Sequence, residues 1–304
     1  MTSFGNNVEK QRFRTVHEVK GLDVLLARPV PIKLGPGRES DQRGSGALNL
    51  STEKLTDGEF PSVDPDLCSA FDLKIILDRV PLLTRNPLRG ASGSVFEADP
   101  TGFAAEQFRL MQRRLTNVRP EGGSVLLTSP GACDGKSLNT HNLAWALAEA
   151  KQSTLLLELD LRRPTQMKYF GAQLTESVVN VLSGEISPAV AVRRLDGLPL
   201  CLLGLSTPAE NPITLLRSDA LQRLIGWARR NFRWVLIDAP PILPVADLEE
   251  LLPSADLVLM VVRERVTPRV MVERAADRLG KRLDYLILND VTVSPANGYG
   301  YDYN

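Results

Sequence analysis

The 304-residue sequence has few cysteines, no excess of charge and no long apolar run, and each absence excludes a class of protein. Its three cysteines, Cys68, Cys133 and Cys201, are too few and too scattered for a disulfide framework or a metal knuckle, which favours a reducing cytoplasm. The 36 basic residues balance 36 acidic residues, so bulk charge does not predict binding to nucleic acid. The sequence contains no run of about 18 apolar residues, so it predicts no membrane span. The N-terminus lacks the apolar core of a signal peptide.

The first 95 residues differ in composition from the rest and are predicted to be linker-like or disordered. The stretch from Arg28 to Gly46 is rich in proline, glycine and charge and has no apolar period, which is typical of a linker. The apolar stretch from Cys68 to Leu83 is too short to build a core. Two interpretations stay open for it: a segment that packs on the main domain, or a docking peptide for a partner.

From residue 101 onward, short apolar runs alternate with stretches of helical periodicity. Six runs have the length of a strand: Ser124–Ser129, Thr154–Asp160, Leu200–Leu205, Trp234–Asp238, Leu257–Val262 and Tyr285–Leu288. Helical periodicity occurs at Ala104–Leu115, Ser137–Ala150, Ile213–Arg230 and Pro268–Leu279. Such alternation is typical of a parallel sheet covered on both sides. We therefore expect a doubly wound α/β domain with a mostly parallel sheet over residues 96–290, and a ligand beyond the carboxyl ends of its strands.

The first of these runs leads into a loop with the composition of a phosphate-binding loop. The segment Pro130–Ser137, PGACDGKS, joins the strand to a helix, so backbone N–H groups and the helix N-terminus can surround phosphates. Lys136 can reach the outer phosphates, and the Ser137 hydroxyl can hold Mg²⁺. Pro130 stands where the strict motif has its first glycine. The expected nucleotide contacts are Gly131, Ala132, Cys133, Asp134, Gly135, Lys136, Ser137 and Leu138.

Acidic residues end two further strands of the predicted sheet. Asp238 ends one, and Glu158 and Asp160 end another, where alternation along a strand would place both side chains on one face. Two carboxylates that converge on a phosphate site require a cation, or one of them acts as a base. The sequence thus predicts ATP and Mg²⁺ as cofactors. The expected metal ligands are Ser137, Glu158 and Asp238, and the expected catalytic residues are Lys136, Glu158, Asp160 and Asp238.

Several motifs of this region occur in combination. They are GKS at a helix start, LLLELDLRRP, NPITLLRS (Asn211–Ser218), LIDAPP with Asp247 downstream, and a tyrosine-rich C-terminus. In this combination, residues 101–304 resemble the bacterial tyrosine kinases of capsule and exopolysaccharide synthesis. The resemblance implies a P-loop ATPase fold that phosphorylates protein, with the terminal tyrosines as its own substrate. By similarity to related P-loop ATPases, Asn289 would contact the nucleotide base.

The same resemblance implies partners. Glu106 and Arg109 match an E-x-x-R-x-x-R motif through which subunits of the family assemble into rings, although the third position here is Gln112; a solvated helix face is the alternative. A membrane polysaccharide chain-length or co-polymerase protein with a cytoplasmic activating tail is the implied partner, and a cognate tyrosine phosphatase would reverse the reaction. The expected location is cytoplasmic, at the inner face of the plasma membrane through that partner.

Two departures from the family bear on activity. The family usually has Asp-x-Asp where this chain has Glu158-x-Asp160, and the added methylene displaces a carboxylate by about 1.5 Å, the scale of a C–C bond. Cys133 stands where the family has a small loop residue, commonly glycine. Two interpretations stay open: a small loop residue without a further role, or an oxidisable switch near phosphate. Two alternatives to a kinase stay open: a nucleotide-binding regulatory module without phosphotransfer, and a partitioning-type switch ATPase, which would carry a lysine where this chain has Gly131.

The C-terminal tail, residues 291–304, holds three of the five tyrosines of the chain: Tyr299, Tyr301 and Tyr303. It alternates tyrosine with glycine and aspartate and has no apolar pattern, so we expect it to be mobile. About fourteen extended residues reach at most roughly 46–50 Å. A tail that starts at the phosphate-loop edge of the sheet could therefore enter its own site or that of a neighbour, where the three tyrosines are the predicted autophosphorylation sites. An aromatic tail tucked on an apolar surface, or simply frayed, is the alternative.

Overall fold

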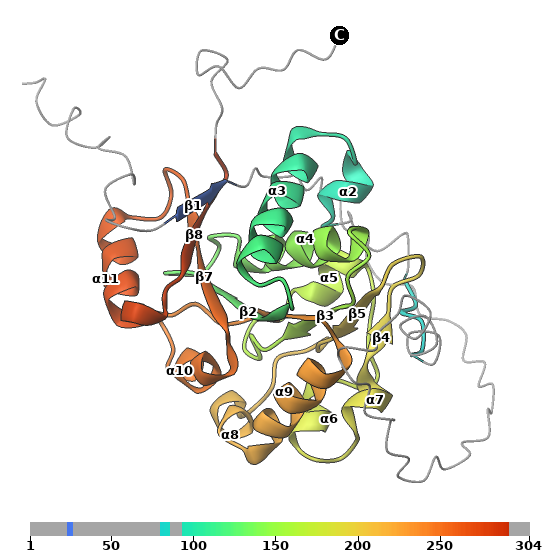
Figure 1. Cartoon of the computed structure of the whole chain (residues 1–304). Coiled ribbons are helices and arrows are strands. Elements are labelled where there is room, and N and C mark those ends of the chain that lie inside the picture. The colour runs from blue at the N-terminus through green and yellow to red at the C-terminus, as the bar shows by residue number, and fades with distance from the viewer. Residues whose placement is uncertain (1–22, 27–79, 86–92, 292–304) are drawn as a thin grey trace, which may run out of the picture.

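The structure is a computed structural model that describes residues 23–26, 80–85 and 93–291 (Figure 1). Its centre is an eight-stranded sheet in the order β1-β8-β7-β2-β6-β3-β5-β4, in which only β4 pairs antiparallel to its neighbour. The strands are β1 (Asp23–Leu26), β2 (Gly123–Thr128), β3 (Thr154–Glu158), β4 (Arg193–Arg194), β5 (Leu200–Leu203), β6 (Trp234–Asp238), β7 (Leu257–Arg263) and β8 (Tyr285–Asn289). This is the predicted doubly wound, mostly parallel α/β fold, and the prediction is confirmed.

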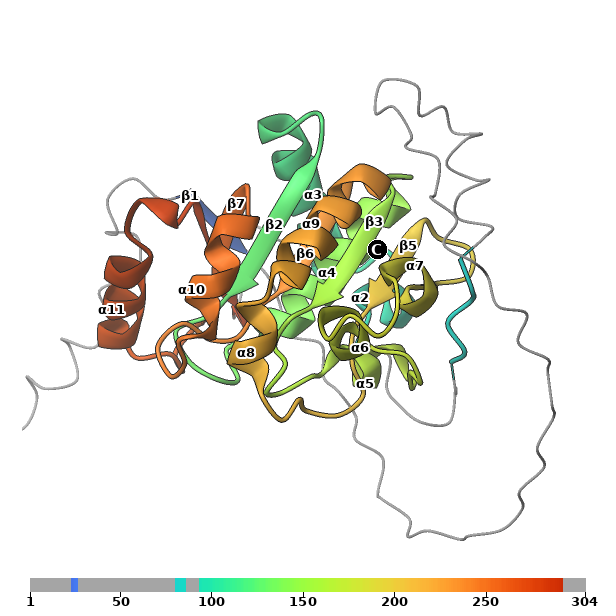
Figure 2. The same ribbon diagram turned by 90° about the horizontal axis from the view of Figure 1, so that it is seen from below.

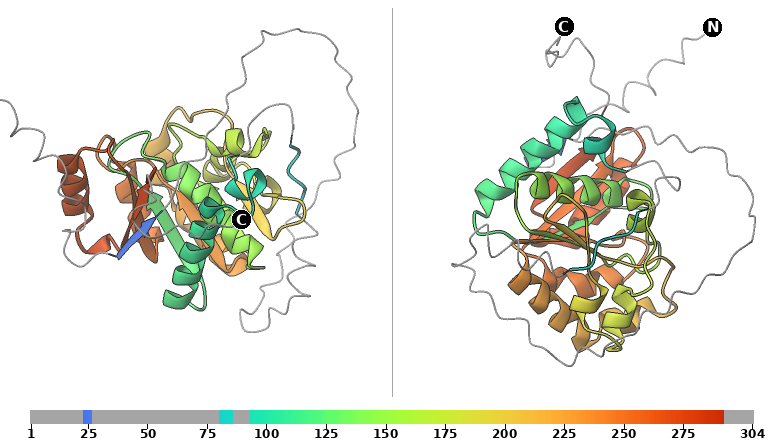
Figure 3. Two further views of the ribbon diagram at one scale, coloured as in Figure 1. Left: turned by 90° about the horizontal axis from the view of Figure 1, so that it is seen from above. Right: turned by 90° about the vertical axis from the view of Figure 1, so that its right-hand side faces the viewer.

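Helices cover both faces of the sheet because the central strands are apolar on both faces. In β3, Leu155 and Leu157 join one core cluster while Leu156 joins the other, as alternation along a strand requires. The first face is covered by α6 (Val178–Leu182), α7 (Pro188–Ala191), α8 (Pro212–Leu216), α9 (Asp219–Asn231), α10 (Asp247–Leu251) and α11 (Arg269–Leu279). The second is covered by α2 (Val95–Ala98), α3 (Phe103–Val118), α4 (Lys136–Glu149) and α5 (Gln166–Phe170). Figure 2 looks onto the first face, and the right-hand view of Figure 3 shows the layers edge-on.

Each of the six predicted strands and four predicted helical stretches has a counterpart in the structure, with one division. The stretch expected as a single helix from Ile213 to Arg230 is two helices, α8 and α9. Ser218 separates them in an extended conformation with φ −74° and ψ 151°, and Asp219 follows it in the first turn of α9. Serine at an N-cap followed by an acidic residue favours a new helix start, because the exposed N–H groups there attract negative charge.

Parts of the N-terminal region that was expected to be linker-like belong to the sheet. Residues Asp23–Leu26 form β1, which pairs with β8 at one edge. At the other edge Leu83 N–H donates to the carbonyl of Arg194 at 2.8 Å, and Arg194 N–H donates to the carbonyl of Pro81 at 2.9 Å. Val80 and Leu83 are buried in the core, so the described end of the Cys68–Leu83 stretch packs on the main domain.

No helix in the described part of the chain is long and apolar enough to cross a membrane.

Candidate functional site

The predicted phosphate loop joins the end of β2, at the centre of the sheet, to the start of α4. Two of its residues have left-handed backbone conformations, Cys133 with φ 68° and Gly135 with φ 96°. A side chain at Gly135 would meet the Asn289 amide nitrogen 2.1 Å from its Cβ, so the loop requires glycine at this position. Cys133 carries the strain that glycine would avoid, and its side chain is exposed, as is that of Ala132.

Side chains from the loop and from two other segments fix the loop. Asp134 accepts hydrogen bonds from the N–H of Gly131 at 3.0 Å and from the Thr267 hydroxyl at 2.6 Å. Asn289, at the end of β8, donates from its amide nitrogen to the Asp134 carbonyl at 3.0 Å. The structure therefore places Asn289 beneath the loop backbone, 5% exposed, where it supports the loop. Leu138, the last predicted nucleotide contact, is partly exposed on the first turn of α4.

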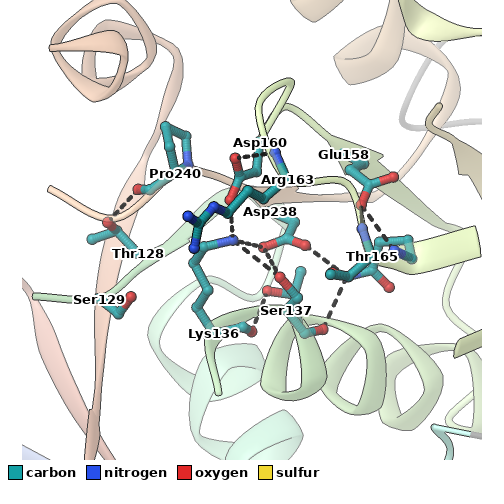
Figure 4. Close-up of polar contacts among 12 residues, drawn as sticks. Thr128, Ser129, Lys136, Ser137, Glu158, Asp160, Arg163, Thr165, Asp238 and Pro240 are labelled. Atoms are coloured by element: carbon teal, nitrogen blue, oxygen red, sulfur yellow. Dashed lines mark hydrogen bonds and ion pairs between the residues drawn. The ribbon is translucent and has the colours of Figure 1, made fainter. Parts of the chain in front are cut away.

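Lys136 lies at the centre of a buried polar cluster (Figure 4). Its ammonium is 2.7 Å from Asp160 Oδ2 and 3.3 Å from Asp238 Oδ1, and it donates to the Ser137 hydroxyl at 3.0 Å. Burial lowers the pKa of Lys136, but the negative charges of Asp238 and Asp160 outweigh that effect and leave the pKa above its ordinary value. The lysine is therefore charged at neutral pH, and it faces two carboxylates with one positive charge.

Ser137 and Asp238 form the part of the cluster that fits a divalent cation. The Ser137 hydroxyl donates to Asp238 Oδ1 at 3.0 Å, and Asp238 is fully buried at the end of β6. Oxygen ligands of this kind are those that Mg²⁺ prefers. Two carboxylates against one lysine also leave one buried negative charge without a balancing cation within the cluster, which fits a bound metal ion.

Glu158 is the predicted residue that the structure does not bring to Lys136. Its Oε1 accepts the N–H groups of Thr165 at 2.5 Å and Gln166 at 2.8 Å, on the side of the cluster away from Lys136 (Figure 4). Leu159 and Asp160 both donate their N–H groups to the carbonyl of Asp238, at 2.9 and 3.0 Å. Because two consecutive N–H groups share one carbonyl, the backbone bends at this point and the strand alternation that the prediction assumed does not continue to Asp160.

Burial has a further effect on Glu158. It raises the pKa of this carboxyl, as does the charge of Asp238 on the adjacent strand, and together they outweigh the hydrogen bonds from Gln166 and Thr165 to bring the pKa to about 8. Asp160 is different: its Oδ2 contacts Lys136, and its Oδ1 accepts the N–H of Arg163 at 3.1 Å. Of the two acids of the LELD segment, Asp160 is thus the one placed at the phosphate loop.

Two polar residues of the site were not among the predicted site residues. Gln166 is fully buried, and its amide nitrogen donates to Asp238 Oδ2 at 2.8 Å and to the Ser137 carbonyl at 2.9 Å. Arg162 forms a two-pronged ion pair with Asp247, at 2.6 and 3.0 Å. Arg162 belongs to the LLLELDLRRP segment and Asp247 lies downstream of LIDAPP, but nothing in the sequence pairs the two. Gln166 belongs to no motif, and only the folded contacts reveal its position.

The residues predicted to mediate self-association lie on α3, away from the phosphate loop. Arg109 donates to both carboxylate oxygens of Glu149 on α4, each at 2.7 Å, and to Glu106 at 2.5 Å. Gln112, at the third position of the motif, is 8% exposed and donates to the Thr116 hydroxyl at 3.0 Å. Arg109 is therefore engaged within the chain, while Gln112 faces the core.

The predicted autophosphorylation sites, Tyr299, Tyr301 and Tyr303, lie outside the described residues. The position from which they leave the fold is described. Strand β8 runs parallel to β7, which is next to β2, so its carboxyl end lies at the same edge as the phosphate loop. Asp290, directly after β8, pairs with Arg263 at 2.8 Å and anchors the chain there.

Comparison with known proteins identifies tyrosine-protein kinases among the relatives of this chain. No family model matches the chain. It is 30% identical over 208 residues to the tyrosine-protein kinase YwqD of Bacillus subtilis, covering 67% of this chain and 88% of that one. It is 31% identical over 210 residues to the putative tyrosine-protein kinase AmsA of Erwinia amylovora, and 28% identical over 208 residues to a putative tyrosine-protein kinase in the cps region of Klebsiella pneumoniae; in each case it spans only 29% of the relative.

Solved structures agree with these relatives. The kinase domain of the Escherichia coli tyrosine kinase ETK matches with a TM-score of 0.62 and 24% identity over 73% of this chain and 93% of that one, which shows the fold. The BceF tyrosine kinase domain matches with a TM-score of 0.59 and 25% identity over 75% of this chain and 98% of that one. From the match to most of YwqD, together with this fold, the chain belongs to the family of bacterial tyrosine-protein kinases.

Proposed function

We propose that this chain is an ATP-dependent protein-tyrosine kinase that phosphorylates its own C-terminal tyrosine cluster and thereby regulates exopolysaccharide polymerisation and export. One observation carries the proposal: Lys136, buried at the end of the phosphate loop, lies between Asp160 and Asp238. This cluster stands at the edge of the sheet from which the tyrosine-bearing tail departs. The relatives are named as a tyrosine-protein kinase and a putative tyrosine-protein kinase, which supports the same reaction.

The phosphate loop and α4 would bind the triphosphate. The backbone N–H groups of Ala132 to Ser137 and the N-terminus of α4 supply positive electrostatic potential for phosphate oxygens. Lys136 would move from its present carboxylate partners toward the outer phosphates, since a bound triphosphate offers it a larger negative charge. Ser137 and Asp238 would hold Mg²⁺, which when bound neutralises charge on the β- and γ-phosphates.

Asp160 is the residue we assign to the incoming tyrosine. A bond forms between the tyrosine oxygen and the γ-phosphorus, while the bond from that phosphorus to the bridging oxygen of ADP breaks. The phenolic proton passes to a carboxylate oxygen of Asp160, whose pairing with Lys136 would be released when the lysine engages phosphate. Glu158 is not assigned this role, because the N–H groups of Thr165 and Gln166 both donate to its carboxyl oxygen Oε1.

The substrate assignment is tested by replacing Tyr299, Tyr301 and Tyr303 together with phenylalanine in the full chain. We expect incorporation of labelled phosphate from ATP to be abolished. The chain has only two other tyrosines, and Tyr285→Phe, at a partly buried position in β8, is the matched control that should keep full labelling. Undiminished labelling of the triple variant would show that the tail is not the substrate.

The partners are proposed on the family relationship. A membrane co-polymerase with a cytoplasmic activating tail would hold the kinase at the inner face of the plasma membrane, and a tyrosine phosphatase would reverse its reaction. Ring assembly through Glu106 and Arg109 would require Arg109 to exchange at least part of its contact with Glu149 for one with a neighbour.

A second candidate, a nucleotide-binding regulatory module without phosphotransfer, is favoured by the position of Glu158 away from Lys136. Nucleotide binding without tyrosine phosphorylation, with the membrane partner present, would select it.

A further inference from the structure

The turn between β3 and α5 places a buried glutamine against the centre of the site. Gln166 is fully buried, which is uncommon for a glutamine, and a buried amide needs hydrogen-bond partners to offset the loss of water. Its side-chain nitrogen has two, Asp238 Oδ2 at 2.8 Å and the Ser137 carbonyl at 2.9 Å. Both partners are acceptors only, so the –NH₂ group, and not the amide oxygen, must face them.

The contact with Gln166 gives the second carboxylate oxygen of Asp238 a hydrogen-bond partner. Oδ1 of this carboxylate accepts from the Ser137 hydroxyl at 3.0 Å and lies 3.3 Å from the Lys136 ammonium. Oδ2 accepts from Gln166 alone among the hydrogen bonds of the described residues. With a partner on each oxygen, the carboxylate plane is fixed; without Gln166, Oδ2 would be buried without a donor and the group could rotate about its χ2 bond, which has a broad energy minimum.

Gln166 also ties Asp238 to the phosphate loop. Its amide bridges the end of β6 to the Ser137 carbonyl in the first turn of α4. The two groups that we assign to the metal ion, the Ser137 hydroxyl and the Asp238 carboxylate, are therefore linked twice, directly at 3.0 Å and through Gln166. This second link does not involve any group that must bind nucleotide.

Glu158 in turn holds Gln166. The carboxylate Oε1 accepts the N–H of Gln166 at 2.8 Å and that of Thr165 at 2.5 Å, which fixes the turn at the start of α5. Gly204, directly after β5, lies close to the other carboxyl oxygen: a Cβ added at Gly204 would lie 3.0 Å from Glu158 Oε2. An aspartate is shorter by one methylene, about 1.5 Å, so the glutamate that departs from the family pattern has the length to reach this turn.

We propose that Gln166 is a positioning residue, which orients Asp238 for the divalent cation and couples it to the phosphate loop, and that Glu158 acts through Gln166 and not as a metal ligand. The inference rests on the proposed binding of Mg²⁺ and nucleotide at this site. It accounts for two residues that the phosphate-loop chemistry alone leaves without a role.

The test measures the affinity of the full chain for a fluorescent ADP analogue with saturating Mg²⁺ and again with EDTA. Methionine has nearly the length of glutamine and no amide, so Gln166→Met removes the hydrogen bonds with little change in volume. We expect the Mg²⁺-dependent gain in affinity to fall about tenfold, within the range that supporting residues of metal sites contribute, while the affinity in EDTA stays within about twofold. Gln112→Met, at the other glutamine that is buried among the described residues, is the matched control and should keep the full gain.

Variants of Glu158 separate its two possible roles. Glu158→Gln retains an oxygen that can accept the two N–H groups, so it should keep most of the Mg²⁺-dependent gain; a direct metal ligand would lose it. Glu158→Ala frees the turn and should lose as much as Gln166→Met, and the double variant Glu158→Ala, Gln166→Met should lose no more than either, because both act through one contact.

Three results would overturn the inference: a full Mg²⁺-dependent gain in Gln166→Met, an equal loss of affinity with Mg²⁺ and EDTA, which would indicate a structural role only, or additive losses in the double variant. A wild-type chain that binds no nucleotide would instead refute the proposed function, so the two failures are distinguishable. Thermal unfolding of each variant identifies any that does not fold. If Glu158→Ala does not fold, the milder variant Glu158→Gln still tests the role of Glu158.

Discussion

The two ends of the central sheet carry clusters made of the same kinds of group, in opposite balance. At the carboxyl end, Lys136 faces Asp160 and Asp238 in an almost fully buried cluster. At the amino end, Asp256 faces two arginines, Arg229 at 3.3 Å and Arg119 at 3.9 Å, whose side chains are partly exposed. One cluster has an excess of acid and the other an excess of base.

Hydrogen bonds explain why only the first cluster fits a ligand. Asp256 Oδ2 accepts from both the N–H and the hydroxyl of Ser124, each at 2.8 Å, so its charge is satisfied within the chain. Burial raises the pKa of Asp256, but the bonds from Ser124 and the two arginines outweigh it and leave the pKa below its ordinary value. The cluster at the amino end is a cross-link, while the acid excess around Lys136 leaves room for a cation.

Removal of a basic side chain at each end of the sheet should give the largest difference in autophosphorylation. Lys136→Ala leaves two buried carboxylates opposed and removes the charge that we assign to phosphate, so autophosphorylation should fall at least about 100-fold. Arg229→Ala removes a partly exposed arginine and should leave the autophosphorylation rate within about twofold. Labelled-phosphate incorporation per folded molecule measures both. A comparable loss in the two variants would contradict a functional difference between the ends.

Removal of an acid at each end gives the second contrast. Asp238→Asn retains the shape of the side chain but removes a charge that we assign to the metal, so the Mg²⁺-dependent gain in nucleotide affinity should fall at least about tenfold. Asp256→Asn should keep that gain and lower the free energy of unfolding by about 1 kcal/mol, since bonds to a charged acceptor weaken. Nucleotide titration and urea unfolding separate the two effects, and loss of the gain in Asp256→Asn would break the comparison.

The stability contribution of Asp256 should depend on pH in a known direction. Because the folded state holds the pKa of this carboxyl below its unfolded value of about 3.9, the stabilisation is present above about pH 4 and is lost as the pH falls through the lower, folded pKa. The difference in unfolding free energy between the wild type and Asp256→Asn should therefore shrink as the pH is lowered from about 6 to about 3. Urea unfolding across this range measures it; a difference that grows toward acid would contradict the assigned contacts.

The smallest effect is expected at the ion pair between α3 and α4, which belongs to neither end. Glu149→Gln weakens the two-pronged contact with Arg109, whose groups are partly exposed, and should cost about 0.5 kcal/mol in the free energy of unfolding, with no change in nucleotide affinity. Thermal or urea unfolding measures this cost. Sedimentation measures subunit assembly in the same variant. A change in assembly by Glu149→Gln would show that this contact also sets the orientation of Arg109 for a neighbour.

Most of the fold could be predicted because its signals are local. The apolar runs that became β2, β3, β5, β6, β7 and β8 are each readable within a few residues, since strands buried on both faces are apolar throughout. Strand β1 was not predicted: its four residues pair with Tyr285–Leu288, more than two hundred residues away, and so short a run has no periodicity of its own. The two-residue strand β4 lacks a signal for the same reason.

The sequence predicted the positions of the site residues that belong to the phosphate-loop motif. It did not predict those that depend on the bend of the backbone after β3. Gly135, Lys136 and Ser137 lie where a phosphate loop requires them, and Asp238 ends its strand as expected. Glu158 lies elsewhere, because two N–H groups share the carbonyl of Asp238 and end the alternation that extrapolation assumed. Gln166 could not be foreseen, since its role arises from contacts with residues 29 and 72 positions away.

The most direct test of a kinase whose substrate is its own tail is a phosphotyrosine map of the full chain, made by mass spectrometry with native Lys136 and with Lys136→Ala. We expect phosphate on Tyr299, Tyr301 and Tyr303 in the native chain and none in the variant. A native chain that binds ATP and Mg²⁺ but carries no phosphotyrosine, or a variant labelled as fully as the native chain, would contradict that claim.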